Sequence, residues 1–409
     1  MRAKQAKPVL RRGVSRLARA RASVRVRRRD RAAIERLRSG GAPRVLVLDV
    51  AVPAHDRSAG GIRMTWILRL LRSLGCQVTL FPVQQRGPSE PYATELRRLG
   101  VEVDLGPRSF VSFAATRAGC YDLVVMSSPD SADFTMGPAR RAFPTAGIVY
   151  DTVDLHFVRV ARGIEFSGDP SHVGYWRAKE LEAFRGSDVI ATVTEAEADV
   201  VRSMVPGART VLLPTVHEPD GADRIPFAQT RDLLFIGGFL HQPNADAVHW
   251  FVREVLPLIR GQIDARLVVI GADPPAEIRA LESPEVVLAG YVPHVESHFR
   301  RARVFVSPLR FGAGMKGKNG QAMAFGLPLV TTTMGADGMD LVDGEHALVR
   351  DGAEAFAAGV VELYLDTELW QRLSRQSQAL VRERWSPDVM RERLDALVSA
   401  AVAEPATER

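Results

Sequence analysis

The chain has 409 residues, more than one ordinary hydrophobic core holds, and this length suits two domains. Hydrophobic residues make up 46% of it and charged residues 25%, as in a globular protein, and no apolar run reaches the roughly 18 residues that span a bilayer. The only cysteines, Cys76 and Cys120, exclude a disulfide framework or a cysteine metal cluster, so we expect a reducing, cytoplasmic setting.

Residues 1–41 are predicted to be a basic N-terminal extension. Residues 1–40 carry 15 Lys or Arg against two acidic residues, whereas the whole chain has a net charge of only +6. The extension has no aromatic residues to stack on bases and no apolar segment typical of a secretory signal, so neither nucleic acid nor secretion is expected. Two interpretations stay open: a disordered tail, or a helix lying on an anionic membrane at its inner face. The second rests on one helical stripe of apolar residues, Leu10, Val14, Leu17 and Val24.

Two series of short apolar runs follow, each alternating with amphipathic stretches. Runs that are apolar throughout and separated by helical patterns are typical of parallel sheets covered on both faces. The first series, within a predicted domain of residues 42–216, lies at 45–50, 78–83, 123–128, 147–152, 189–194 and 211–215. The second, within a predicted domain of residues 232–384, lies at 233–238, 266–271, 286–292, 304–309 and 328–333.

The segments around the second domain lack this alternation. Residues 217–231 have turn-forming residues and no periodicity, so they are predicted to be the linker. Residues 385–409 are predicted to be a C-terminal helix and tail, with Ser386 before Pro387 marking a helix start. The fold class expected is therefore α/β, with two Rossmann-like, doubly wound parallel-sheet domains facing an interdomain cleft, where ligands of such sheets bind.

A glycine- and lysine-rich loop is the strongest indication of a binding site. It follows the run at 304–309, contains Gly312 and Gly314, and opens a predicted helix near Lys318. Glycines allow the backbone to approach a ligand, and free N–H groups at a helix start favour an anion. Beyond the basic extension the chain has only three lysines, and two of them, Lys316 and Lys318, lie here. The loop therefore predicts a phosphate site.

Two further features extend that site. Arg310 precedes the loop and offers a third positive charge. Gly237 and Gly238 end the first run of the same domain, where they could admit a ligand's phosphates or simply make a packing turn.

Residues 308–330, and more loosely most of residues 44–390, resemble the retaining glycosyltransferases of family 4 (group 1), which have the GT-B fold. The resemblance rests on the glycine loop, on Lys318 three residues before Gln321, and on the run from Ala322 to Val330. It implies that the C-terminal domain binds a nucleotide sugar and the N-terminal domain binds the acceptor, which would be a glycan, a lipid or a small molecule.

The resemblance also implies roles for single residues. The backbone at Tyr291 and Val292 would meet the base, Asn319 would belong to the donor site, and Gln321 would hold the ribose. Gln321 stands where the family has an acidic residue, and Ala313 stands where the family has another glutamate. Arg310, Lys316 and Lys318 are therefore expected to carry more of the diphosphate contact.

In the N-terminal half, polar residues follow a predicted strand. Asp151, Asp154 and His156 stand at the carboxyl end of the run at 147–152, where a ligand would be reached. The resemblance makes His156 the candidate for contact with the transferred sugar, whereas the aspartates could equally cap the next helix. Gly60 and Gly61 precede a helix at a turn that borders the donor or acceptor in similar enzymes.

These features predict transfer of a hexose-type sugar with retention of anomeric configuration and without a metal or other cofactor. Lys316, Lys318 and His156 are the expected catalytic residues, since cations must stabilise the leaving diphosphate when no metal does. A glycosidase is not expected, because no flanking carboxylate pair is evident. The missing glutamates leave a second hypothesis, a non-catalytic subunit that binds a nucleotide sugar or acts as a scaffold.

Overall fold

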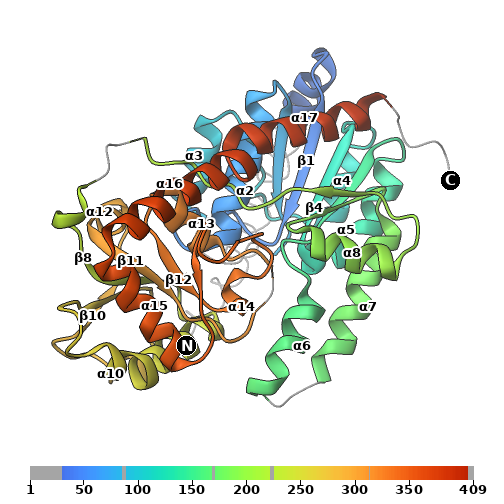
Figure 1. The fold of residues 1–409 in the computed structure, drawn as a ribbon. Coiled ribbons are helices and arrows are strands. Elements are labelled where there is room, and N and C mark those ends of the chain that lie inside the picture. The colour runs from blue at the N-terminus through green and yellow to red at the C-terminus, as the bar shows by residue number, and fades with distance from the viewer. Residues whose placement is uncertain (1–29, 85–88, 168–170, 222–224, 313, 404–409) are drawn as a thin grey trace, which may run out of the picture.

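The computed structural model describes residues 30–84, 89–167, 171–221, 225–312 and 314–403. These residues form two α/β domains joined by the segment after residue 212 (Figure 1). The apolar stripe expected within residues 1–29 lies outside the described residues. No helix in the described parts of the chain is long and apolar enough to cross a membrane.

The N-terminal domain is built on a seven-stranded parallel sheet of order β3-β2-β1-β4-β5-β6-β7. Its strands are β1 (Arg44–Asp49), β2 (Gln77–Pro82), β3 (Glu102–Val103), β4 (Leu123–Ser127), β5 (Gly147–Asp151), β6 (Val189–Thr192) and β7 (Thr210–Leu212). Its helices are α2 (Ala59–Ser73), α3 (Tyr92–Arg98), α4 (Phe110–Thr116), α5 (Ser128–Ala142), α6 (His156–Ser167), α7 (Ser171–Gly186) and α8 (Glu195–Met204). The strand order reverses direction between β1 and β4, which marks the ligand-binding crevice of a doubly wound sheet.

The C-terminal domain repeats this plan with a six-stranded parallel sheet of order β10-β9-β8-β11-β12-β13. Its strands are β8 (Arg231–Ile236), β9 (Leu267–Ile270), β10 (Val286–Gly290), β11 (Ala302–Ser307), β12 (Leu329–Thr331) and β13 (Leu348–Val349). Its helical elements are η1 (Phe227–Gln229), α9 (Gln242–Trp250), η2 (Phe251–Val255), α10 (Leu256–Ile259), α11 (Ala276–Arg279), α12 (Glu296–Arg301), α13 (Gly317–Ala324), α14 (Thr333–Ala336), α15 (Ala353–Leu365) and α16 (Thr367–Arg384).

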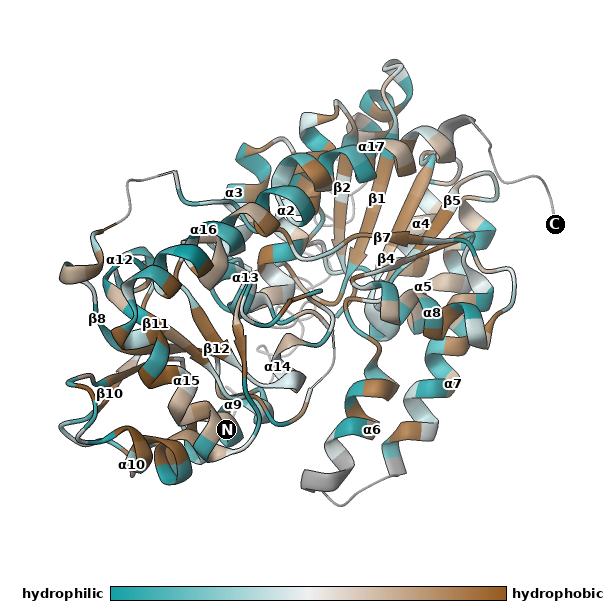
Figure 2. Cartoon of the chain, in the orientation of Figure 1, coloured by the Kyte–Doolittle hydropathy of each residue, from teal (hydrophilic) through white to brown (hydrophobic). Residues whose placement is uncertain are grey.

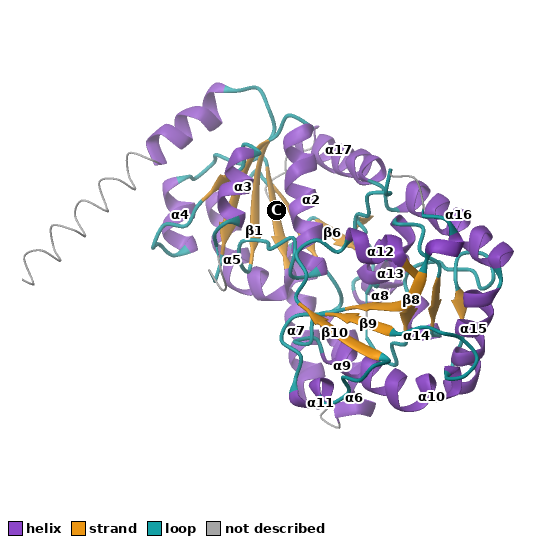
Figure 3. Cartoon of the chain, turned by 90° about the vertical axis from the view of Figure 1, so that its left-hand side faces the viewer, coloured by secondary structure: helices purple, strands orange, loops and turns teal. Residues whose placement is uncertain are grey.

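Helices cover both faces of each sheet, and the strands are apolar along their length (Figures 2 and 3). In β4 all five residues are buried, and in β1 the central four are. Strands buried on both faces must be continuously apolar, which is the pattern that predicted them. The doubly wound α/β architecture expected from the sequence is thus confirmed.

The last helix, α17 (Pro387–Ala403), returns to the N-terminal domain after α16 has packed on the C-terminal one (Figure 1). Its apolar side, including Leu394 and Val398, lies in the core formed with α2 and the first sheet. Val389 N–H donates to Ser386 Oγ (3.4 Å), which is the cap expected from the Ser-Pro pair. The chain therefore crosses between the domains twice.

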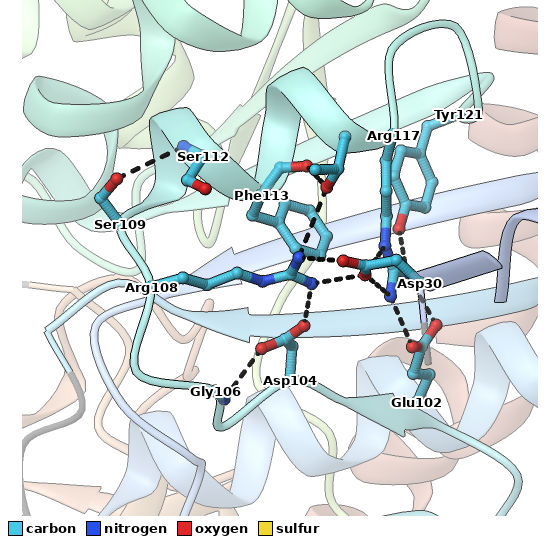
Figure 4. A network of polar contacts seen from close by, with 11 residues as sticks. Asp30, Glu102, Asp104, Gly106, Arg108, Ser109, Ser112, Phe113, Arg117 and Tyr121 are labelled. Carbon is cyan, nitrogen blue, oxygen red and sulfur yellow. Dashed lines mark hydrogen bonds and ion pairs between the residues drawn. The ribbon is translucent and has the colours of Figure 1, made fainter. Parts of the chain in front are cut away.

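The part of the predicted extension that the structure describes belongs to the fold. Residues 30–39 are helical, and Ala33 and Leu37 are buried. Asp30 is 5% exposed and accepts hydrogen bonds from Arg108, and Arg117 lies 3.3 Å from the same carboxylate (Figure 4). Arg117 in turn donates to Glu102 at 2.7 Å. A buried ion network therefore attaches this helix to the edge of the first sheet.

We expect Arg117→Met to destabilise the protein by about 3 kcal/mol, because it leaves Asp30 and Glu102 short of a buried partner. Urea unfolding followed by circular dichroism measures this. Arg31→Met is the matched control, since the Arg31–Glu35 pair on the same helix is 83% and 67% exposed and should leave the midpoint unchanged. Equal midpoints for both variants would show that the network does not hold the helix.

Candidate active site

The glycine-rich loop between β11 and α13 lies directly against the N-terminal domain. Gly314 has φ of +66°, and a Cβ there would be 3.0 Å from Asp154 Cβ; a Cβ on Gly317 would be 3.1 Å from Ala59 Cβ. Gly312 has φ of +145°. A side chain at Gly314 or Gly317 would press on the N-terminal domain, so these glycines let the loop lie against it, at the position of the interdomain cleft expected from the sequence.

Two helix N-termini meet at this contact. Ala59 begins α2 and Gly317 begins α13, and no side chain caps the start of α13. The start of a helix carries partial positive charge, which remains although Ser58 Oγ accepts from Gly61 N–H in α2 and Asn319 N–H donates to the Lys316 carbonyl oxygen in α13. The cleft therefore has anion-attracting dipoles from both domains.

The two lysines lie on the C-terminal side of the cleft but have different partners. Lys316 Nζ donates to the Gly314 carbonyl oxygen (2.7 Å) and lies 3.8 Å from the Asp337 carboxylate. Lys318 Nζ donates to Asn244 Oδ1 and lies 4.5 Å from the centre of the Phe235 ring. Burial lowers the pKa of Lys316 to about 8 and, together with Lys316, that of Lys318 to about 7.

Some of the remaining residues predicted to bind the donor have free space beside them, whereas others are packed inside the domain. At Gly238 a Cβ would meet nothing within 4 Å, whereas at Gly237 it would be 2.7 Å from Asn244. Gln321 is partly exposed on α13. Asn319 is fully buried, and its Nδ2 donates to the Gly335 carbonyl oxygen (2.9 Å), so the geometry gives it a packing role in place of the expected donor contact.

Arg310 lies beside α9 and is not a free third cation. Its Nε donates to Asp246 Oδ2 at 2.9 Å, and its guanidinium lies 6.0 Å from the Trp250 ring. The expected contribution of Arg310 to a diphosphate contact is thus offset by a carboxylate. The positive charge of the cleft wall rests mainly on the lysines.

Tyr291 and Val292 follow β10, near the N-terminal domain. Val292 packs partly into the C-terminal core, whereas the Tyr291 side chain is 43% exposed and its hydroxyl bonds to Asp56. The Arg57 guanidinium lies 5.4 Å from the Tyr291 ring. At another point, Arg162 of α6 pairs with Asp337 and donates to the Gly312 carbonyl oxygen (3.3 Å). Polar contacts thus join the domains at two places on the cleft.

On the N-terminal wall, His156 begins α6 with its Nδ1 facing acceptors. Nδ1 lies 3.2 Å from the Asp154 carbonyl oxygen and 3.0 Å from Asp154 Oδ1. Glu180 accepts from the His156 backbone N–H at 3.0 Å, and the Trp176 ring lies 5.0 Å from the imidazole. Acceptors at Nδ1 favour the proton there, which leaves Nε2 as an acceptor. Although burial opposes it, His156 and Arg159 lower the pKa of Asp154.

Asp151 does not reach the cleft, contrary to the expectation that it lines the acceptor side. It is fully buried, and both carboxylate oxygens accept from Arg63, at 2.7 and 2.8 Å. Arg63 also donates to the Leu213 carbonyl oxygen (2.7 Å). Asp151 therefore links β5, α2 and the end of β7 instead of binding a ligand.

Gly60 and Gly61 differ in the space around them. A Cβ on Gly61 would lie 2.3 Å from the Ala54 carbonyl oxygen, so this glycine is required by packing. At Gly60 the nearest atom to such a Cβ is Val153 Cγ1 at 3.8 Å. Gly60 therefore leaves room beside the loop that carries Asp154.

Three residues that the sequence did not indicate complete the site. Asn244 accepts a hydrogen bond from Lys318, and the Asp337 carboxylate lies 3.8 Å from Lys316 Nζ. Glu197 accepts from the backbone N–H groups of Leu155 (3.2 Å) and Val193 (3.3 Å). Burial, with Asp154 nearby, raises the pKa of Glu197 to about 7. Asn244 lies 74 positions from Lys318 and Glu197 lies 42 positions from Leu155, and an acidic residue in the first turn of a helix is by itself an ordinary capping pattern. In the described parts of the chain, no group of three or more His, Cys, Asp or Glu could hold a metal ion.

Removing a structural cation and removing a site cation should have opposite effects on stability. We expect Arg63→Met to cost about 3 kcal/mol or more, because Asp151 would be left buried and unpaired. Lys318→Met should preserve or raise stability, because burial and a neighbouring lysine disfavour the charged form of the side chain that it removes. Chemical denaturation of both variants tests this; a large loss of stability in Lys318→Met would contradict the assignment.

Residues 230–366 match the family model described as glycosyl transferases group 1. The comparison with curated proteins gives no match.

Solved structures match over nearly the whole chain. Sucrose-phosphate synthase from Thermosynechococcus elongatus is 17% identical with a TM-score of 0.69, covering 88% of this chain and 99% of its own. A glycosyltransferase from Rickettsia africae is 11% identical with a TM-score of 0.67, covering 89% and 99%. HepE from Anabaena, solved in complex with UDP and glucose, is 14% identical with a TM-score of 0.67, covering 88% and 100%. The GT-B fold expected from the sequence is thereby confirmed.

Proposed function

Because residues 230–366 match the group 1 glycosyltransferase family model and the fold is GT-B, we propose that the chain transfers a hexose-type sugar from a nucleotide-sugar donor. The acceptor would be a glycan, a lipid or a small molecule, and the anomeric configuration would be retained. The observation that carries the proposal is the cleft in which Lys316, Lys318 and the starts of α2 and α13 converge. The match to HepE, which was solved with UDP and glucose and with UDP-glucose, supports a sugar donor carried on a nucleotide such as UDP.

The donor's diphosphate would lie between the two helix starts, with Lys316 and Lys318 beside it. Transfer breaks the bond between the anomeric carbon and the diphosphate, so negative charge grows on the leaving group. Preorganised cations and N–H groups stabilise that charge in a site that needs no metal. A phosphate oxygen of the leaving group would take the proton of the acceptor hydroxyl, which attacks from the same face of the sugar.

On the opposite wall, His156 would contact the transferred sugar through Nε2. Asp154 holds the imidazole at Nδ1, Glu180 accepts from the His156 backbone N–H, and Glu197 fixes the backbone of the loop that carries both Asp154 and Leu155. The sugar would thus be oriented by the N-terminal domain while its phosphates are held by the C-terminal one. Orientation of this kind reduces the entropic part of the barrier.

Incubating the protein with UDP-, GDP-, ADP- and dTDP-sugars, with and without EDTA, tests the reaction. Chromatography should show donor hydrolysis or transfer with one donor class, unaffected by EDTA, and NMR coupling constants of the product should show a retained anomeric configuration. Binding without turnover would instead support the second candidate, a non-catalytic subunit. That candidate is favoured by Gln321, a neutral residue at the position where the resembling family has an acid.

Lys318→Ala should lower turnover by about 100-fold or more, the effect of removing one stabiliser of transition-state charge. Steady-state kinetics with the donor identified in the panel measure this. Arg231→Ala is the control, because Arg231 lies at the start of β8, at the opposite end of the sheet from the cleft. Unchanged turnover in Lys318→Ala would rule out its role in catalysis.

A further inference from the structure

Asn244 joins the two glycine turns of the C-terminal domain. It is 4% exposed at the start of α9, and its Nδ2 donates to the Gly238 carbonyl oxygen at 2.7 Å. Its Oδ1 accepts from Lys318 Nζ, on α13. The amide also fills the space beside Gly237, where a Cβ would be 2.7 Å away. One side chain therefore fixes both the turn after β8 and the lysine of the glycine loop.

Lys318 differs from the other cations around the cleft because its hydrogen-bond partner is neutral. Lys316 lies beside Asp337, Arg159 pairs with Asp154, and Arg310 pairs with Asp246. An amide oxygen accepts the hydrogen bond of an ammonium but supplies no charge to balance it. Within the described residues, no carboxylate forms an ion pair with Lys318 Nζ.

The other charged or titratable groups around Lys318 do not compensate for this. Lys316, on the same loop, repels it. His241, in the turn before α9, is the second titratable neighbour, and the charge of Lys318 disfavours its protonated form. The Phe235 ring beneath the ammonium offers only its π face. A partly buried cation without a counter-charge is costly unless a ligand supplies that charge.

We propose that Asn244 is the positioning residue that holds the Lys318 ammonium at the anion site without neutralising it, leaving its charge for the diphosphate of the donor. The proposal rests on the proposed function only in taking the anion to be that diphosphate. An aspartate at this position would keep the shape and the hydrogen bond to Lys318 while balancing its charge, but it would lose the hydrogen bond that Nδ2 donates to the Gly238 carbonyl oxygen. The neutral amide thus sets the anion affinity of the site.

This arrangement links anion binding to proton uptake. With a pKa of about 7, Lys318 is mostly neutral in the free protein at higher pH, and a bound diphosphate would raise that pKa and recharge it. Anion affinity should therefore be highest below about pH 7 and fall about tenfold per pH unit above it. The loss should continue until the pKa of the complex is reached.

Isothermal titration with UDP, GDP and ADP, in buffers of different ionisation enthalpy, tests this on wild type, Asn244→Asp and Asn244→Ala. Near pH 8.5 the wild type should take up about one proton with the diphosphate that binds. Asn244→Asp should take up none, and its affinity should be weaker below about pH 7 and independent of pH up to about pH 9. Asn244→Ala should weaken binding yet retain proton uptake. Identical pH dependence in wild type and Asn244→Asp would overturn the proposal.

A second measurement keeps the proposal testable if the proposed function fails and no nucleotide binds. The unfolded state binds more protons than the folded state between the folded pKa of Lys318, about 7, and its unfolded value near 10.4. The wild type should therefore gain stability against urea as pH rises from about 7 to 9. Its unfolding constant should fall by up to about tenfold per pH unit relative to that of Asn244→Asp. Parallel pH curves for the two proteins would refute the role of Asn244.

Discussion

The candidate site depends on one positive charge, that of Lys318, which is partly buried and has no carboxylate partner within the described residues. Burying a cation is unfavourable unless a counter-charge or a ligand compensates for it. Arg63, Arg162 and Arg310 each pair with a carboxylate, whereas Lys318 has an amide and an aromatic ring. Lys318 lies beside the glycine turns, where an anionic ligand could supply the negative charge that the protein lacks there.

The same constraint explains why the site belongs to both domains. The glycine loop has to lie close to the N-terminal wall for the start of α13 to face the start of α2, and Gly314 and Gly317 allow this because they have no side chain. Asp56 with Tyr291 and Arg162 with Asp337 then join the walls at two further points. A donor held by the C-terminal domain would thereby lie against His156, whose ring is oriented by Asp154 and whose backbone N–H donates to Glu180.

Much of the fold could be predicted from the sequence because strands buried on both faces are continuously apolar. The run predicted at 45–50 is β1 (Arg44–Asp49), and the run at 123–128 is β4. The strands β3 and β13 were not predicted, since each has two residues and so shows no pattern. Residues 30–39 were expected to lie outside the fold because they belong to an arginine-rich stretch, and the buried pairing of Asp30 depends on residues about 80 positions away.

The site could be predicted less completely, because side-chain partners distant in sequence decide which residues are free. The sequence indicated Lys316, Lys318 and the glycines, which are close together and chemically distinctive. It could not show that the Asp151 carboxylate is paired with Arg63, that Asn319 donates a hydrogen bond within its own domain, or that the charge of Arg310 is balanced by Asp246. Asn244 lies 74 positions from Lys318, and an asparagine near a helix start has many ordinary roles.

The most direct test of the account compares a nucleoside diphosphate with the matching nucleoside, such as UDP with uridine, for binding to the intact protein. If the cleft is built for a diphosphate, charge-assisted hydrogen bonds from the lysines and the helix starts should make the diphosphate bind at least about 100-fold more tightly. Equal affinities for the two compounds, for whichever base binds best, would contradict the claim that the unbalanced charge of Lys318 serves a phosphate ligand.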